Sequence, residues 1–390
     1  MSARDQEAAG ASRTSGDLLD VIVIGGGQAG LAMAWHLTRH DLRFLVLEAG
    51  PRIGHTWQSR WDSLTLFTPT QHDALPGMPF PGPPDTYPGK DAVAGYLTSY
   101  AAAFGLPVRL NARVTGLSRT AEGFGIRTQD EVLRARQVVV ATGPFQAPFV
   151  PPAAQRLDRQ VTQLHSAGYR NPAALPPGPV LVVGGGNSGF QIAEELAATR
   201  KVDLSIATRA PVLPQRLAGK DLFWWLTRSG LMRVSVASRP GRRMSGREFV
   251  IGGSRRRLQA AGARFRPALA GADGRTVQFA DGTSLDVETV IWATGYRPDY
   301  SWIHTPGVTR GGKVIHRRGV TDVPGLYFVG LSWQHTRGSA LLGFVNDDAA
   351  FLAGRIAARH HPGDLPSPQI QAGRETQDAE GPQPVSRGLE

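Results

Sequence analysis

The stretch DVIVIGGGQAGLAMAWHLTRH, residues 20–40, decides the fold of this chain. A short apolar run leads into glycines at positions 25, 27 and 30, and a helical pattern follows. At this spacing the first glycine permits a tight turn, the second lets the backbone approach a pyrophosphate, and the third lets the helix pack against the strand. The helix N-terminus then offers free N–H groups and a partial positive charge to phosphates. The stretch therefore predicts a dinucleotide-binding loop.

The next apolar run, FLVLEAG, ends the unit with an acid. Glu48 lies 18 residues after Gly30. A carboxylate at that distance can accept hydrogen bonds from both hydroxyls of an adenosine ribose. We therefore expect the first loop to bind a dinucleotide with an unphosphorylated ribose, as in FAD.

A second copy of the same pattern, PVLVVGGGNSGFQIAEELAATR, occupies residues 179–200. Its three glycines are Gly184, Gly186 and Gly189, and the following strand ends with Arg209 instead of an acid. A guanidinium can pair with a ribose 2′-phosphate through two parallel hydrogen bonds, whereas a carboxylate would repel it. The second loop is therefore predicted to prefer NADPH to NADH.

Each loop is followed much later by an apolar strand that ends in Ala-Thr-Gly, at 141–143 and at 293–295. Repetition of both signals in one order predicts an α/β fold of two Rossmann-like dinucleotide-binding domains, with the NADPH domain inserted in the FAD domain. We expect the FAD domain at 19–150 and 296–361 and the NADPH domain at 151–295. The ends, 1–18 and 362–390, are rich in small and polar residues and are predicted to be disordered tails.

The composition excludes several classes of protein. The chain has no cysteine, so disulfides, thiolate metal sites and a redox-active dithiol are ruled out, and no metal is expected. The net charge is +11, but the densest basic stretch, 228–266, has few aromatic residues for stacking on bases. We read it as a solvated face that also attracts anionic cofactors, and expect no nucleic acid partner.

The chain has no apolar run of the ~20 residues that would span a bilayer, and its start lacks the apolar stretch of a signal peptide. We therefore expect a cytoplasmic protein without membrane contact, and leave a homo-oligomer open.

These motifs resemble the class B flavoprotein monooxygenases, which include the flavin-containing monooxygenases, the plant YUCCA enzymes and bacterial CzcO-like proteins. The resemblance covers about residues 19–360. IGHTWQSRWDSLTLFTP (53–69) is similar to the family segment after the ribose acid, although His55 replaces a glycine. LPGMPFPG (75–82) and GGGNSG (184–189) also match.

The loops and the resemblance together assign site residues to each cofactor. For FAD they are Gly25, Gly27, Gln28, Ala29, Gly30, Glu48, Thr56, Trp57, Val114, Ala141, Thr142 and Gly143. For NADPH they are Gly184, Gly186, Asn187, Ser188, Gly189, Arg209, Thr294 and Gly295.

One family signature is altered. The pattern Phe-x-Gly-x-x-x-His-x-x-x-Tyr/Trp aligns with RQVTQLHSAGY, where Arg159 and Val161 replace the Phe and the Gly. His165 and Tyr169 are retained. We expect the gating between the two cofactors to differ from the family pattern, and a plain linker role for His165, bonded to backbone, is an equal alternative.

The resemblance implies that NADPH reduces FAD and that reduced FAD reacts with O₂ to give a C4a-peroxyflavin. One oxygen atom then passes to a small organic substrate. The residues show no acid–base triad; Arg60, His165 and Asn346 are candidate catalytic residues, and Gln71 and His72 lie in segments expected near the flavin. The alternatives are an NADPH-dependent reductase or diaphorase that serves a quinone or protein, and a non-catalytic nucleotide-dependent regulator.

Overall fold

The computed structural model describes residues 13–14, 17–208, 210–247 and 249–360. Arg209 and nearly all of the two predicted tails therefore lie outside the described residues. Arg13 and Thr14, which fall in the first predicted tail, pair in parallel with Glu131 and Val132.

The larger of the two main sheets has eight strands, with the parallel core β4-β3-β2-β7 and an antiparallel extension β7-β6-β5. β24 also pairs with β7 in parallel. Its strands are β1 (Arg13–Thr14), β2 (Leu19–Ile24), β3 (Phe44–Leu47), β4 (Val108–Arg109), β5 (Gly116–Thr120), β6 (Gly123–Arg127), β7 (Glu131–Val140) and β24 (Leu326–Phe328).

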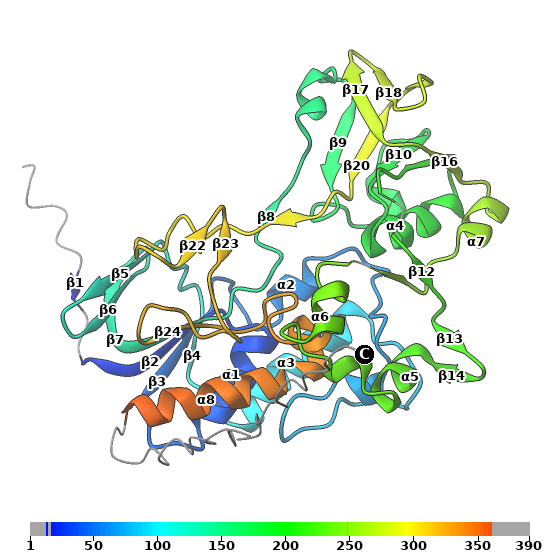
Figure 1. Ribbon diagram of the computed structural model, residues 1–390. Helices are drawn as coiled ribbons and strands as arrows, with labels where there is room; N and C mark the ends of the chain where they lie inside the picture. Colours follow the sequence, from blue (N-terminus) through cyan, green and yellow to red (C-terminus); the bar gives the residue numbers. More distant parts are fainter. Residues whose placement is uncertain (1–12, 15–16, 209, 248, 361–390) are drawn as a thin grey trace, which may run out of the picture.

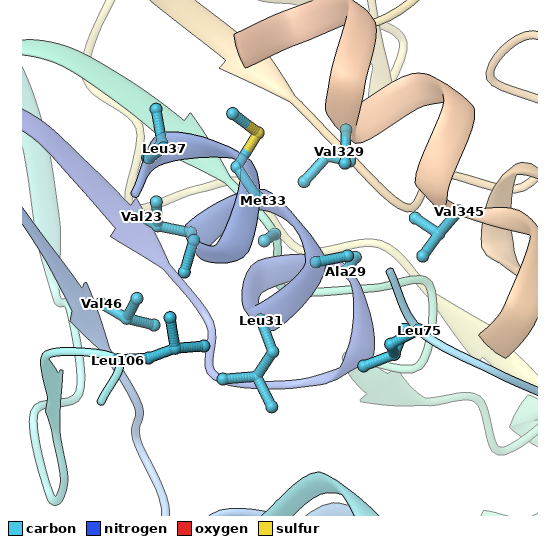
Figure 2. Packing of buried hydrophobic residues seen from close by; sticks show 14 of the residues in the cluster. Val23, Ala29, Leu31, Met33, Leu37, Val46, Leu75, Leu106, Val329 and Val345 are labelled. Carbon is cyan, nitrogen blue, oxygen red and sulfur yellow. The ribbon is translucent and has the colours of Figure 1, made fainter. Parts of the chain in front are cut away.

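Both faces of this sheet are covered, which explains the unbroken apolar run of β2. Val21 and Val23 face the helices α1 (Gln28–Leu37), α3 (Lys90–Ala103) and α8 (Asn346–His360) and share one core with them. Figure 2 shows Val23 and Val46 of the sheet against Leu31 and Met33 of α1. Ile22 and Ile24 point to the opposite layer, where the antiparallel strands pack.

The second sheet is entirely parallel, in the order β16-β11-β10-β20-β9. Helices α4 and α7 cover one face, and a small antiparallel sheet, β17-β18-β19, covers the other. The elements are β9 (Thr162–His165), β10 (Val180–Val183), α4 (Asn187–Ala197), β11 (Val202–Ser205), α7 (Arg255–Ala260), β16 (Arg264–Arg266), β17 (Leu269–Asp273), β18 (Thr276–Phe279), β19 (Ser284–Asp286) and β20 (Thr289–Trp292).

The second sheet lies within the chain between β7 and β24, so the domain that contains it is inserted in the other one. The chain enters through β8 (Ala147–Pro148) and leaves through β21 (Tyr296–Arg297), which pair antiparallel as a short ribbon between the two lobes in Figure 1. The predicted fold class, two Rossmann-like domains with one inserted, is confirmed. The exact domain bounds stay a prediction.

Between β11 and α7 the chain makes an excursion, residues 211–254, which we call the insert. It returns towards the FAD domain: Gln215 donates to the Phe67 carbonyl at 2.6 Å, and the Val236 amide donates to the His335 carbonyl at 2.8 Å. Its elements are β12 (Val212–Leu213), β13 (Arg216–Leu217), β14 (Lys220–Asp221), α5 (Leu222–Arg228), α6 (Arg239–Met244) and β15 (Val250–Ile251). Further short elements are α2 (His55–Gln58) and the hairpin of β22 (Thr309–Arg310) and β23 (Lys313–Val314). None of the described helices is both long and apolar enough for a membrane span.

Candidate dinucleotide sites

The turn glycines of the two loops have the same backbone conformation and the same kind of close backbone neighbour. Gly25 has φ +114°, and a Cβ added to it would lie 2.5 Å from the carbonyl oxygen of Ala141. Gly184 has φ +133°, and its Cβ would lie 2.1 Å from the carbonyl oxygen of Ala293. Only glycine fits either position, by backbone conformation and by space. The Ala-Thr-Gly motif therefore follows each loop because its alanine backbone closes over the turn.

The third glycine of each loop fixes the helix to the turn. A Cβ on Gly30 would lie 1.8 Å from the carbonyl oxygen of Gly25, and a Cβ on Gly189 would lie 2.0 Å from that of Gly184. Glycine at these positions lets α1 and α4 pack directly on their own turns. The two predicted loops are thus built alike, atom by atom, about 160 residues apart.

The middle glycines carry the strongest indication of a ligand. Gly27 and Gly186 precede α1 and α4 with φ −80° and −88°, a backbone conformation that any residue adopts. No atom of the described residues lies within 4 Å of a Cβ added at either position. The protein itself therefore does not require glycine there, but a pyrophosphate approaching the helix N-terminus would. Each loop therefore leaves space for a pyrophosphate in front of its middle glycine, Gly27 or Gly186, and we call this space a pyrophosphate cradle. Both cradles fit a dinucleotide.

Glu48 is held at the rim of the first loop. Its Oε2 accepts from the Gly26 amide at 2.8 Å, and its Oε1 accepts from the Gly50 amide at 2.7 Å. These bonds fix the carboxylate and leave each oxygen a further lone pair for a ribose hydroxyl. At the second loop Ile206 takes the corresponding place, 2.6 Å from a Cβ added at Gly185, so among the described residues an apolar side chain stands where Glu48 stands in the first loop.

The side-chain amide of Asn187, a predicted NADPH residue, is engaged by the insert. Nδ2 donates to the Phe249 carbonyl at 3.0 Å, and Oδ1 accepts from the Ile251 amide at 2.9 Å. The residue therefore ties β15 to the N-terminus of α4. Ser188 lies half-buried in the first turn of that helix.

Two of the three candidate catalytic residues meet at the ribbon between the domains. His165, at the end of β9, donates from Nε2 to the Gly295 carbonyl at 2.9 Å and accepts at Nδ1 from the Ala167 amide at 3.1 Å. Arg60 donates to the hydroxyl of Tyr296, whose ring lies 5.0 Å from that of His165. Burial lowers the pKa of His165 and the Arg60 charge lowers it further, against the Gly295 hydrogen bond, which raises it.

Asn346 lies elsewhere, at the start of α8, where its Oδ1 is 2.8 Å from Nε2 of His36. Gln71 is engaged with Asp85, donating to it at 2.9 Å. Neither residue joins Arg60 and His165.

The other predicted FAD residues form the surroundings of the first loop. Gln28 donates to the Ala340 carbonyl at 2.9 Å, which fixes the chain before α8 to the start of α1. The Thr142 hydroxyl and the Gly143 carbonyl each accept from Nε2 of Gln146 at 2.9 Å. Trp57 packs on the core of the FAD domain, Val114 packs on its opposite layer, and Thr56 lies in α2 beside Trp57. In the second domain the Thr294 hydroxyl donates to the Phe149 carbonyl.

The sequence prediction missed Gly330, which follows β24. A Cβ on it would lie 2.6 Å from the Cβ of Ala29, so this turn closes on the first turn of α1. GLYFVG repeats the apolar-strand-then-glycine pattern of the other sites, and that signal could have identified it.

It also missed a buried acid, Asp73. This side chain is 0% exposed, its Oδ1 accepts from the Thr68 hydroxyl, and its Oδ2 has no hydrogen-bond partner among the described residues. Burial raises the pKa of Asp73 to about 7, and the nearby Asp221 charge raises it further, against the Thr68 hydrogen bond. The ring of the neighbouring His72 packs against the rings of Phe223 and Phe344.

A cavity of about 370 Å³ lies between the insert and the chain that leads into α8. Thr227 and Met232 line it from the insert, and His335, Phe344 and Asn346 line it from the FAD domain. The insert and the stretch before α8 therefore meet at one cavity.

Comparisons with known proteins agree with this geometry. The model of the family described as pyridine nucleotide-disulphide oxidoreductase matches residues 22–218. An uncharacterized CzcO-like oxidoreductase of Geobacillus kaustophilus is 45% identical over 87% of this chain and 98% of its own. Indole-3-pyruvate monooxygenase YUCCA1 of rice (Oryza sativa) is 29% identical over 82% of this chain and 88% of its own. The structure of a flavin-containing monooxygenase from Stenotrophomonas maltophilia superimposes with a TM-score of 0.75 at 29% identity, over 88% of this chain and all of that one.

Two pyrophosphate cradles on two Rossmann-like domains define a flavoprotein that uses FAD and NADPH. The chain belongs to the class B flavoprotein monooxygenases, within the pyridine nucleotide-disulphide oxidoreductase family. The predicted family, both cofactors and the NADPH-dependent oxidoreductase class are thereby confirmed.

Proposed function

We propose that the protein transfers one oxygen atom from O₂ to a small organic substrate at the expense of NADPH. One observation carries this proposal: the chain has two pyrophosphate cradles and no cysteine. The two cradles provide an electron donor and a flavin, whereas the protein has no dithiol to receive the electrons. O₂ or an external molecule is then the acceptor, and the monooxygenases among its relatives favour O₂.

When bound, FAD supplies the hydride acceptor and the centre that activates O₂. The protein's part is to bind and orient. We assign the FAD pyrophosphate to the first loop in front of α1, and the adenosine ribose to Glu48, which is already fixed by two amides. The second loop holds the pyrophosphate of NADPH, and Arg209 is assigned to its 2′-phosphate.

We assign Arg60 and His165 a positioning role at the ribbon. Arg60 comes from the FAD domain and reaches Tyr296 in β21, while His165 holds Gly295 directly before that strand. Both therefore act on the strand through which the NADPH domain returns to the FAD domain. A correct relative placement of the two dinucleotides depends on this strand.

The cavity between the insert and α8 is our candidate for the substrate site. Met232 and Phe344 give it apolar wall, and Thr227, His335 and Asn346 give it hydrogen-bonding groups. Such a mixture suits a small organic molecule with an apolar body and one polar end. The relatives named for indole-3-pyruvate and for flavin-containing monooxygenation support oxygenation of a molecule of this size.

The proposal is tested by following NADPH and oxygen together in the FAD-loaded protein. A monooxygenase consumes NADPH and O₂ in equal amounts and forms oxygenated product in place of H₂O₂ when a substrate is added. A reductase or diaphorase would instead return the oxygen as H₂O₂ and would accelerate with a quinone. No turnover with any acceptor would favour the regulator.

A further inference from the structure

The insert carries an exposed aromatic surface that the proposed chemistry does not use. Its members, which we call the indole patch, are Leu217, Lys220, Trp224 and Trp225. Leu217 is 54% exposed, Trp224 37% and Trp225 38%. Large apolar side chains on a protein surface mark a contact site when they are contiguous.

The patch is contiguous. The indole N–H of Trp225 donates to the Leu217 carbonyl at 2.9 Å, and the two indole rings lie 4.7 Å apart at right angles. The Lys220 ammonium lies 5.8 Å from the centre of the Trp224 ring, and Leu217 is paired with Lys220 across the hairpin β13–β14. In Figure 1 this hairpin projects from the body of the molecule beside α5.

The insert that carries the patch is basic in composition. The insert holds eight basic residues against two acidic ones. The basic residues are Arg216, Lys220, Arg228, Arg233, Arg239, Arg242, Arg243 and Arg247. Of the two acids, Asp221 is 1% exposed and caps α5 by accepting from the Phe223 amide. It therefore adds little negative charge to the surface.

Contrary to the expectation from the sequence, we propose that the indole patch docks the protein on an anionic lipid surface. Indole rings settle at the headgroup level of a bilayer, where the apolar ring body and the N–H are both accommodated. Lys220 and Arg228 would lie beside anionic headgroups, and each basic residue near such a surface strengthens binding by about fivefold. The positive charge disfavours a second copy of the chain as the occupant, because a two-fold interface would place the same basic patch against itself.

Docking would also place the substrate side of the insert near the lipid. Phe223 of α5 is buried in a cluster with Phe67 and Phe344, and Thr227 and Met232 of the same segment line the cavity. An apolar substrate dissolved in the bilayer would then have a short path to that cavity. This consequence rests on the proposed function, whereas the docking itself does not.

The test is sedimentation of the full-length, FAD-loaded protein with vesicles of phosphatidylglycerol and phosphatidylcholine, compared with vesicles of phosphatidylcholine alone. We expect binding to the anionic vesicles that weakens at high salt. Removing both charges in K220Q/R228Q should weaken binding by about twenty-fivefold, at about fivefold for each charge. W224S/W225S should weaken binding on both kinds of vesicle by tenfold or more.

The matched control is R310Q/K313Q, which removes the same two charge types from the exposed hairpin β22–β23. It should bind as the unchanged protein does, and all variants should retain FAD and oxidise NADPH at the original rate. Equal binding by the patch variants and the control would overturn the proposal. The proposal would also be overturned if the unchanged protein sedimented without vesicles and W224S/W225S did not. In that case the patch would join copies of the chain. If the unchanged protein did not oxidise NADPH at all, the proposed function would be contradicted, but the docking result would still stand.

Discussion

The Nε2 atom of His165 donates a hydrogen bond to the carbonyl oxygen of Gly295, 2.9 Å away. The two residues are 130 positions apart in the chain. His165 ends β9, and Gly295 lies in the turn after β20, the strand that pairs with β9 in the NADPH domain. The bond fixes the chain at the point where it leaves that domain for β21. This geometry is the backbone-bonded role that the altered signature left as an alternative, and it is compatible with a positioning function.

We predict that His165→Ala slows reduction of FAD by NADPH about tenfold, because a small misplacement of reacting groups is costly. The FAD content should not change. His165→Gln can still donate to the Gly295 carbonyl and should recover part of the rate. Anaerobic stopped-flow absorbance of the flavin measures both. An unchanged rate in the alanine variant would leave His165 without a positioning role.

The glycines of the first loop should separate folding from cofactor binding. Gly27→Ala places a methyl group where the protein leaves space, so we expect normal thermal stability without ligand but little bound FAD. Gly25→Ala forces a side chain into a left-handed backbone conformation against Ala141, which should cost at least ~1–3 kcal/mol of folding free energy. Flavin absorbance and calorimetry of the apoprotein distinguish the two. A Gly27→Ala variant with full FAD content would contradict the assignment of this cradle.

Asp73 should give the stability a recognisable pH dependence. Its pKa in the fold is about 7, above the usual 3.8, so the fold favours the protonated acid. The contribution of Asp73 to the free energy of unfolding is fully present below the usual pKa and is lost as pH rises through about 7. Asp73→Asn stays uncharged at every pH. The melting temperature of this variant, relative to that of the unchanged protein, should therefore rise from pH 5 to pH 8.

The histidines act in the opposite direction at the acid end. Burial lowers the pKa of His36, His72 and His165, so their contribution is lost as pH falls below the usual 6.5. Comparing the two melting curves isolates Asp73, because both proteins share these histidines. Parallel curves would show that Asp73 ionises normally.

Arg209 lies outside the described residues, and its role stays a prediction from the sequence. Arg209→Ala should raise the KM for NADPH about ten- to a hundredfold, from the ~1.5–3 kcal/mol of a charge-assisted phosphate contact, and leave NADH nearly unchanged. Arg243→Ala, an exposed arginine of α6, is the matched control and should alter neither value. An equal effect of Arg209→Ala on both cofactors would remove the assignment.

The parts of this molecule that sequence could predict are those set by local spacing. Gly25 and Gly184, with the Ala-Thr-Gly strands that close over them, follow from short motifs whose geometry hardly varies. The parts that it could not predict are contacts between distant segments. The closure of Gly330 on Ala29 depends on where a late strand enters the sheet.

The insert shows the same limit in another way. The basic stretch 228–266, which overlaps the insert, was predicted to be a solvated face, but composition does not say which side chains of the insert fold inward. Phe223 is buried, whereas Trp224 and Trp225 beside it are exposed, because the docking of α5 on Phe67 and Phe344 decides the orientation. The side chain of Asn187 also bonds to distant residues that the local motif does not indicate, Phe249 and Ile251, more than 60 positions away.

The most direct test of the account is the fate of oxygen during NADPH turnover. The FAD-loaded protein is supplied with isotopically labelled O₂ and, in separate reactions, a sulfide, a tertiary amine, a cyclic ketone and an indole-like 2-oxo acid. We predict that at least one of these gains a single labelled oxygen atom per NADPH consumed, while H₂O₂ release falls. Recovery of all the oxygen as H₂O₂ in every reaction, together with faster NADPH oxidation when a quinone is added, would contradict it and identify a reductase.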